Sequence, residues 1–173
     1  MSGQHLNAQA RRVVSGLDAA GKSTIVLDEY TRSRVAREAS TVCDVWRVDS
    51  LPPQMAEDDT LTERRETSLP SNGFVVRVAT FPPEREIDWA VARREPPYSS
   101  IPDGYSDIPG LHVTETVDVV TVVSGELYAV LETTETLLRP GDTFIQRGTK
   151  HAWSNRGTEP VTVVAVMMAA KPS

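Results

Sequence analysis

The sequence has a single cysteine, no long apolar run and no block of basic residues. One cysteine in 173 residues excludes an intramolecular disulfide framework and favours a reducing, cytoplasmic location. No run of about eighteen apolar residues is present, which excludes a transmembrane helix, and residues 1–12 lack the apolar segment of a secretory signal. Because the net charge is -6, we expect neither nucleic acid nor a membrane as partner.

The segment GLDAAGKST, residues 16–24, has the pattern of a phosphate-binding loop but lacks its surroundings. Such a loop follows a buried strand and opens a helix. Here the short RRVVS precedes it, and the β-branched run Thr24–Leu27 follows. The sequence therefore predicts a turn at Asp18–Lys22 between two strands, with Gly21 at positive φ. We expect no nucleotide-binding residues.

The chain divides into two zones that differ in their turn signals. Up to about residue 110 it is interrupted by proline and charge, with strands predicted at 24–27, 42–48 and 74–81 and a helical turn around Trp89. From residue 111 short β-rich segments alternate with tight turns, which is typical of an all-β sandwich or barrel.

Two stretches of the second zone carry histidines at defined spacings. HVTETVDVVTVVSG runs from His112 to Gly125, and GDTFIQRGTKHAWSN runs from Gly141 to Asn155. In a strand, residues an even number apart share a face, so His112, Thr114 and Asp118 point to one side if no bulge intervenes. If the alternation is shifted by one residue, Asp118 faces solvent instead.

These stretches resemble the paired motifs of the cupin superfamily, H-x-H-x(3,4)-E-x6-G and G-x5-P-x-G-x2-H-x3-N. His112 matches the first histidine, while Thr114 and Asp118 stand in place of the second histidine and the glutamate. His151 matches the later histidine, in a second motif that lacks the proline and is one residue short.

The resemblance implies an all-β, cupin-type β-barrel or jelly roll with an irregular, strand-containing N-terminal extension. We expect residues 1–40 to form that extension, with a β-hairpin that two copies could exchange. We expect residues 41–173 to form a single barrel domain, with the motifs within 110–156.

The resemblance also implies a metal site formed by His112, Asp118 and His151. Two imidazoles and a carboxylate suit one divalent ion, Fe, Mn, Ni or Zn. Thr114 is a poor ligand and is placed beside the ligands, and Gln146 and Trp153 are candidates for the surrounding substrate pocket. Two alternatives remain: a metal-free pocket whose polar groups bind a ligand, and no functional site. His5 is placed in a mobile terminus, outside the site.

For the function, three hypotheses follow. The first is a metal-dependent enzyme acting on a small organic acid or carbonyl compound, by decarboxylation, dehydration or isomerisation through a stabilised enolate. The second is a non-haem iron oxygenase at the same site, and the third is a non-catalytic small-molecule-binding protein. A homodimer is expected, in which part of residues 10–50 contacts the partner.

Overall fold

A computed structural model describes residues 3–55, 58–61, 69–98, 101 and 106–171. The described part is nearly all β. Its strands are β1 (Arg11–Leu17), β2 (Ser23–Tyr30), β3 (Arg34–Ala36), β4 (Thr41–Val48), β5 (Phe74–Phe81), β6 (Thr116–Ser124), β7 (Leu127–Leu131), β8 (Glu135–Leu138), β9 (Thr143–Arg147), β10 (His151–Ser154) and β11 (Val161–Ala169). The helical elements are short: 3-10 turns at Gln4–Asn7 and Glu84–Glu86, and α1 (Trp89–Ala92). Among the helices described, none is both long enough and apolar enough to cross a membrane.

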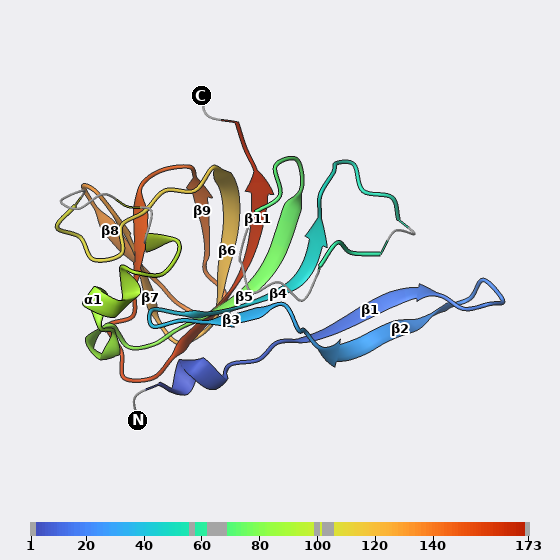
Figure 1. Cartoon of the computed structure of the whole chain (residues 1–173), viewed down its shortest axis with the longest axis horizontal. Coiled ribbons are helices and arrows are strands. Elements are labelled where there is room, and N and C mark those ends of the chain that lie inside the picture. Colours follow the sequence, from blue (N-terminus) through green and yellow to red (C-terminus); the bar gives the residue numbers. More distant parts are fainter. Residues whose placement is uncertain (1–2, 56–57, 62–68, 99–100, 102–105, 172–173) are drawn as a thin grey trace.

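The strands form a jelly roll of two main sheets, as predicted. A six-stranded sheet has the order β3-β4-β5-β11-β6-β9, and a three-stranded sheet has the order β10-β7-β8 (Figure 1). The paired strands are antiparallel, which permits the tight hairpin connections that the sequence indicated. The strands predicted at 24–27, 42–48 and 74–81 correspond to β2, β4 and β5.

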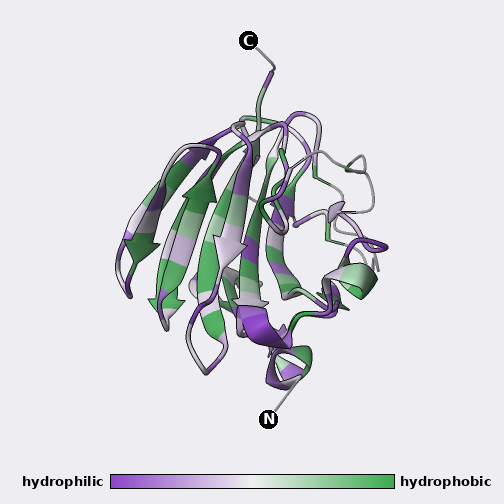
Figure 2. Cartoon of the chain, turned by 90° about the vertical axis from the view of Figure 1, so that its left-hand side faces the viewer, coloured by the Kyte–Doolittle hydropathy of each residue, from purple (hydrophilic) through white to green (hydrophobic). Residues whose placement is uncertain are grey.

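The core forms where the inward residues of the two sheets meet. Hydrophobic and hydrophilic residues alternate as bands along the strands in Figure 2, because successive side chains of a strand point to opposite faces. On β6, for example, Val120 and Val122 are buried while Val123 is exposed. The buried cluster comprises Ala79, Val120, Val122, Leu127, Ala129, Leu138, Val161, Val163 and Ala165. Burial of this cluster holds the two sheets together.

The segment that resembled a phosphate-binding loop is a hairpin turn. β1 and β2 pair with each other in a separate two-stranded sheet. Between them, the Asp18 carboxylate accepts hydrogen bonds from the backbone N–H groups of Ala20 (2.8 Å) and Lys22 (2.9 Å), and Gly21 has φ 73°. The prediction of a turn with Gly21 at positive φ is confirmed. The hairpin projects away from the barrel (Figure 1).

The helical turn predicted around Trp89 is α1. Asp88 precedes it, and its carboxylate accepts hydrogen bonds from the N–H groups of Ala90 and Val91. This is the usual arrangement of a helix N-cap. The prolines on both sides limit the helix to four residues.

Candidate functional site

The interior of the barrel is apolar towards one end of β6 and polar towards the other. From the end of β6 back to its start, the inward residues are Val122, Val120, Asp118 and Thr116, all buried. On the neighbouring β9 the inward residue Gln146 lies opposite Asp118 in the register and is also buried. Buried polar groups are costly unless they are paired or serve a ligand, so the polar end is the candidate site.

His112 and His151 lie together at this polar end, as the resemblance to the cupin motifs implied. The backbone N–H of each donates to the carbonyl of the other, both at 2.9 Å, in an isolated bridge between the segment before β6 and the start of β10. The two ring centroids are 4.4 Å apart, and the rings are inclined by 48°. Both residues are buried. The bridge therefore joins the two main sheets where the imidazoles meet.

Hydrogen bonding and burial favour a neutral His112. Its Nδ1 lies 2.9 Å from the carbonyl oxygen of Gly110; because a carbonyl only accepts, Nδ1 carries the proton and Nε2 a lone pair. Burial lowers the pKa of His112 from 6.5 to about 4, and the neighbouring His151 acts in the same direction. Burial also lowers the pKa of His151. Both imidazoles are thus uncharged at neutral pH.

Gln146 fixes the turn that carries His151. Its Oε1 accepts from the N–H of Gly148, so its Nε2 faces the other way and donates to the carbonyl of Thr149. The same Nε2 lies 2.8 Å from Nδ1 of His151, which is itself 3.0 Å from the Thr149 carbonyl. The residue that the sequence placed in the pocket is therefore beside the histidine, in contact with its ring.

Asp118 faces the interior, so the alternative in which it faces solvent is excluded. It is 3% exposed, and its Oδ1 has no hydrogen-bond partner among the described residues. Burial raises the pKa of Asp118, while the Thr116 hydroxyl and the charge of Arg77 act against that rise. Thr114 lies next to this carboxylate and accepts a hydrogen bond from Thr116 at 2.9 Å.

The three predicted ligands are not gathered into a ready metal site. Within the described ranges, no group of three or more His, Cys, Asp or Glu side chains lies close enough together to hold a metal ion. The imidazoles of His112 and His151 are adjacent, and the Asp118 charge acts on the pKa of His112, but the three side chains do not form such a group.

Aromatic rings enclose the histidine pair. Trp153 packs edge-on against His151, with ring centroids 5.6 Å apart, and against Phe144 at 5.8 Å. On the other side, Tyr98 packs edge-on against His112 at 5.5 Å. Burial raises the pKa of Tyr98 to about 12, so its phenol stays protonated. These rings shield the imidazoles from water.

Sequence reasoning missed a buried ion pair beside the site. Arg77 on β5 donates from Nε to Asp44 Oδ1 at 2.6 Å and from Nη2 to Oδ2 at 3.1 Å, and both side chains are largely buried. The register places the two residues opposite each other on β4 and β5. One signal was available: Arg77 lies between Val75 and Ala79, two inward positions of the alternating segment FVVRVATF.

The placement of His5 in a mobile terminus was wrong. His5 is buried in the first 3-10 turn, and its Nε2 lies 2.9 Å from the carbonyl oxygen of Arg37. The contact with a residue 32 positions away fixes the segment before the hairpin.

Comparison with known proteins agrees with this architecture. Residues 98–167 match the family model of the cupin domain. This match places residues 98–167 in the cupin superfamily. The matched range contains both histidines and Asp118, so the cupin motifs and the polar end of the barrel coincide.

Three relatives illustrate the range of similarity of this cupin. The phomopsin biosynthesis cluster protein C' of Diaporthe leptostromiformis is 40% identical over 88 residues, which are 44% of this chain and 47% of that protein. The chain thus spans about half the length of this relative. The cupin-domain-containing oxidoreductase virC of Hypocrea virens is 24% identical over 170 residues, 93% of this chain and 76% of that protein. A solved cupin 2 conserved barrel domain protein from Salinispora arenicola has 15% identity and a TM-score of 0.39, covering 56% of this chain and 64% of that one.

Proposed function

We propose that this cupin is an enzyme that acts on a small organic acid or carbonyl compound at the polar end of its barrel. The observation that carries the proposal is the juxtaposed His112–His151 pair in the same interior as Asp118, whose Oδ1 is buried without a partner. A buried, unpartnered carboxylate oxygen destabilises the fold. Its presence is explained if a ligand or ion supplies the missing partner.

The side chains at this end have the donor chemistry of a divalent metal site, although the described residues do not form a ready group of three ligands. His112 uses Nδ1 for its hydrogen bond to the Gly110 carbonyl, which leaves the Nε2 lone pair available. This is the usual state of a histidine that binds a metal. His151 has its Nδ1 engaged by the turn in the same way. We propose that His112 and His151 would hold the ion and that Asp118 would supply the balancing negative charge. Two imidazoles and a carboxylate suit Fe, Mn, Ni or Zn.

In this proposal, the ion supplies Lewis-acid chemistry by polarising a substrate carbonyl oxygen and stabilising the negative charge of an enolate. The protein orients the side chains of the site and keeps water away from them. The Thr149 carbonyl accepts from Gln146 Nε2 and from the Nδ1–H of His151, so this turn holds the His151 ring in one orientation. The neutral imidazoles keep their Nε2 lone pairs available, and Tyr98 and Trp153 shield the pair from water. Decarboxylation, dehydration and isomerisation all require such charge stabilisation.

A second candidate is an iron-dependent oxygenase at the same residues. It is favoured by the match to virC, which is named an oxidoreductase and which aligns with 93% of this chain. Both candidates use the two histidines and Asp118, and they differ in the metal and in the need for oxygen.

Metal analysis of protein purified without added metal tests the proposal. We expect the wild type to retain a divalent ion. Most of this ion should be lost from the variants His112→Ala, Asp118→Ala and His151→Ala, because a site that loses one of few ligands binds metal weakly. Asp118→Asn should also lose metal, since it removes the negative charge that balances the ion. Thr114→His should bind more tightly, because it restores the missing ligand of the family motif. Glu115→Ala, which removes an exposed carboxylate in the same segment, is the matched control.

The identity of the metal separates the candidates. Redox-active iron favours the oxygenase, and zinc, nickel or manganese favours the enolate chemistry. Equal metal content in the wild type and in the histidine variants would show that the ion binds elsewhere. If the wild type neither retains nor binds a divalent ion, the metal proposal is wrong. Thermal stabilisation by small carboxylates or ketones would then indicate a binding protein.

A further inference from the structure

The α1 segment, residues 88–98, is held to the barrel by hydrogen bonds from the turn between β3 and β4. Glu38 of this turn contacts the segment on both sides of α1. Its carboxylate accepts a hydrogen bond from the backbone N–H of Asp88 at 2.9 Å, and its own backbone N–H donates to the carboxylate of Glu95 at 3.0 Å. A single residue thus fixes the position of the helix at its start and beyond its end.

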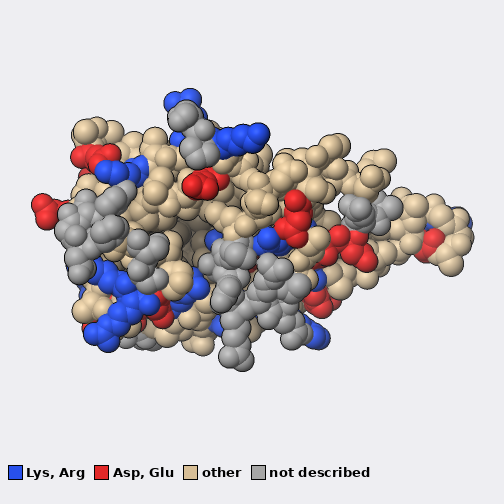
Figure 3. Space-filling model, turned by 45° about the horizontal axis from the view of Figure 1, so that its top comes forward, with Lys and Arg blue, Asp and Glu red and all other residues tan. Residues whose placement is uncertain are grey.

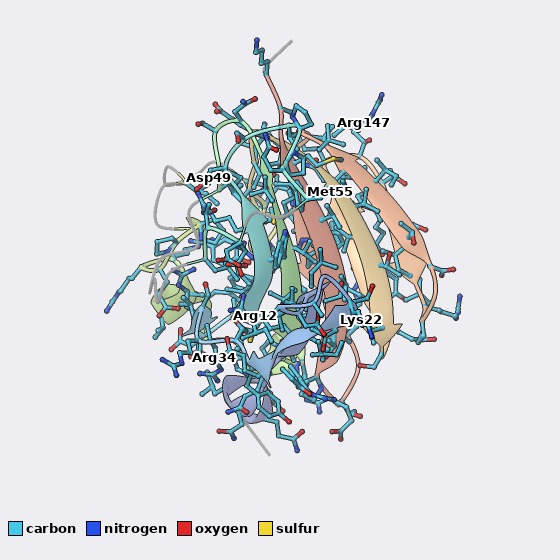
Figure 4. The ribbon with its side chains drawn as sticks, turned by 90° about the vertical axis from the view of Figure 1, so that its right-hand side faces the viewer. Arg12, Lys22, Arg34, Asp49, Met55 and Arg147 are labelled. Atoms are coloured by element: carbon cyan, nitrogen blue, oxygen red, sulfur yellow. The ribbon has the colours of Figure 1, made fainter. Side chains whose placement is uncertain are left out.

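The turn that carries Glu38 is itself fixed by the N-terminal residues. Next to Glu38, Arg37 donates from Nη1 to the carbonyl of Pro96 at 2.9 Å, and its own carbonyl oxygen lies 2.9 Å from Nε2 of His5. Arg34 on β3 donates from Nε to the carbonyl of Ala8 at 2.7 Å, and Figure 4 shows Arg34 beside the N-terminal turn. The contacts of Glu38 are therefore made from a well-supported position.

Specific contacts, rather than a surface of one charge, account for how the α1 segment is held. In the view of Figure 3, acidic and basic side chains are interspersed over the barrel. Ala92 of α1 is fully buried, so the helix packs on the barrel through a small side chain. The hydrogen bonds of Glu38 then set where the rest of the segment lies.

The α1 segment brings two aromatic rings to the residues around His112. Tyr98 packs edge-on against the His112 ring and Trp89 packs edge-on against Tyr98, with centroids 5.5 and 5.8 Å apart. A Cβ at Gly110 would lie 2.7 Å from the Trp89 ring and 3.5 Å from the Tyr98 ring, so both rings confine the backbone there. The Gly110 carbonyl is the group that accepts the Nδ1–H of His112 at 2.9 Å. The two rings therefore confine the group that selects the tautomer of His112.

We propose that Glu38 is a positioning residue for the candidate site. By holding both sides of α1, it keeps Trp89 and Tyr98 against the backbone and ring that they confine. The proton of His112 then stays on Nδ1 and its lone pair on Nε2. This inference rests on the proposed function, in which that lone pair would bind the ion, because partners that fix the tautomer and orientation of a histidine strengthen its binding to a metal.

The tautomer of His112 in the metal-free protein tests this role. Long-range proton–nitrogen NMR of protein with labelled histidines, at a pH above the ordinary pKa of histidine, distinguishes a proton on Nδ1 from one on Nε2. We expect only the Nδ1 tautomer in the wild type and an averaged mixture of both in the double variant Glu38→Leu/Glu95→Leu. His151 is the internal control and should keep its tautomer, because its Nδ1 contacts the carbonyl of Thr149.

Two matched variants separate the loss of the hydrogen bonds from the loss of charge. Glu38→Gln/Glu95→Gln keeps an acceptor oxygen at each position and should retain the single tautomer of His112. Glu126→Leu, which changes an exposed glutamate of another turn, should retain it as well. Zinc titration of the same proteins should give an affinity about tenfold weaker in the double leucine variant alone.

Several outcomes would overturn the inference. One is a single Nδ1 tautomer of His112 in the double leucine variant, and another is a mixture in the double glutamine variant. A similar change at His151 would show that the whole site had loosened, and equal zinc affinities of the wild type and the leucine variant would show that positioning by Glu38 does not matter for the ion. A wild type that binds no zinc would refute the metal proposal, and the tautomer comparison would still decide the role of Glu38.

Discussion

Separating the buried ion pair between Asp44 and Arg77 is expected to destabilise the barrel. Both side chains are largely buried, at 7% and 11% exposure, so each charge depends on the other to offset the loss of water. Breaking a buried pair leaves one charge uncompensated, whereas replacing both partners by apolar groups is often tolerated. The position of Arg77 near Asp118 makes this pair a neighbour of the candidate site.

We predict that Asp44→Asn lowers the free energy of unfolding by about 3 kcal/mol, while the double variant Asp44→Leu/Arg77→Met recovers most of that loss. Urea unfolding and a double-mutant cycle measure both effects. Glu126→Gln, which breaks an exposed pair with Arg139, should leave stability nearly unchanged. Equal losses in the single and double variants would contradict the prediction.

The neutral His112 makes the metal-free protein sensitive to acid. The folded pKa is about 4 against an ordinary value of 6.5, so the unfolded chain takes up a proton first as the pH falls. Stability should decrease between pH 6.5 and 4, by about 3 kcal/mol in full. Asp118, whose pKa is raised, acts in the opposite direction because its folded carboxyl group protonates first.

Unfolding in a chelator across this pH range checks the effect. His112→Gln should flatten the loss of stability towards acid, and Asp118→Asn should steepen it. The same pH dependence in the wild type and in His112→Gln would show that His112 does not titrate as its burial indicates.

At the scale of the element, the turn between β6 and β7 depends on a glycine for two reasons. Gly125 has φ 80°, and a Cβ there would lie 2.7 Å from a Val161 methyl group. Gly141 has φ 94°, but a Cβ there would meet nothing within 4 Å. A substitution at Gly141 therefore tests the effect of the backbone conformation alone, whereas one at Gly125 adds a steric contact.

We expect Gly141→Ala to cost about 1 kcal/mol through its backbone conformation alone. Gly125→Ala should cost clearly more, because Val161 must also shift. Thermal and urea unfolding of the two variants provide the comparison, and a Gly125→Ala variant as stable as Gly141→Ala would contradict it.

How well the sequence predicts a feature depends on how far apart in the chain the interacting residues lie. Alternation along β6 correctly predicted Asp118 and Val120 as inward residues, and local turn chemistry correctly predicted the hairpin at Gly21. The resemblance to the cupin motifs correctly implied that His112 and His151 lie together. The Asp44–Arg77 pair was missed because it depends on the register of two strands separated by a long loop. His5 was misplaced because its burial depends on a carbonyl 32 residues away. The projection of the β1–β2 hairpin away from the barrel could not be predicted either, because packed and projecting hairpins have the same sequence pattern.

At the scale of the whole molecule, stability should reside in the apolar end of the barrel. Leu127 is fully buried within the core cluster, whereas Leu51 is 49% exposed. We predict that Leu127→Ala lowers the free energy of unfolding by about 3 kcal/mol, and that Leu51→Ala changes it little. Urea unfolding measures both, and similar effects of the two substitutions would show that the core does not hold the sheets.

The division of the barrel interior has a consequence for how such a protein diversifies. Because the apolar end holds the two sheets together, substitutions at the polar end should have smaller effects on the stability of the fold. Asp118 lies on β6 and Gln146 on β9, and Thr114 comes two residues before β6, whose inward residues Val120 and Val122 belong to the core. Laboratory evolution confined to these positions should therefore yield a high fraction of folded variants. The side chains of the site can then change, and with them the molecules that bind there, while the fold stays the same.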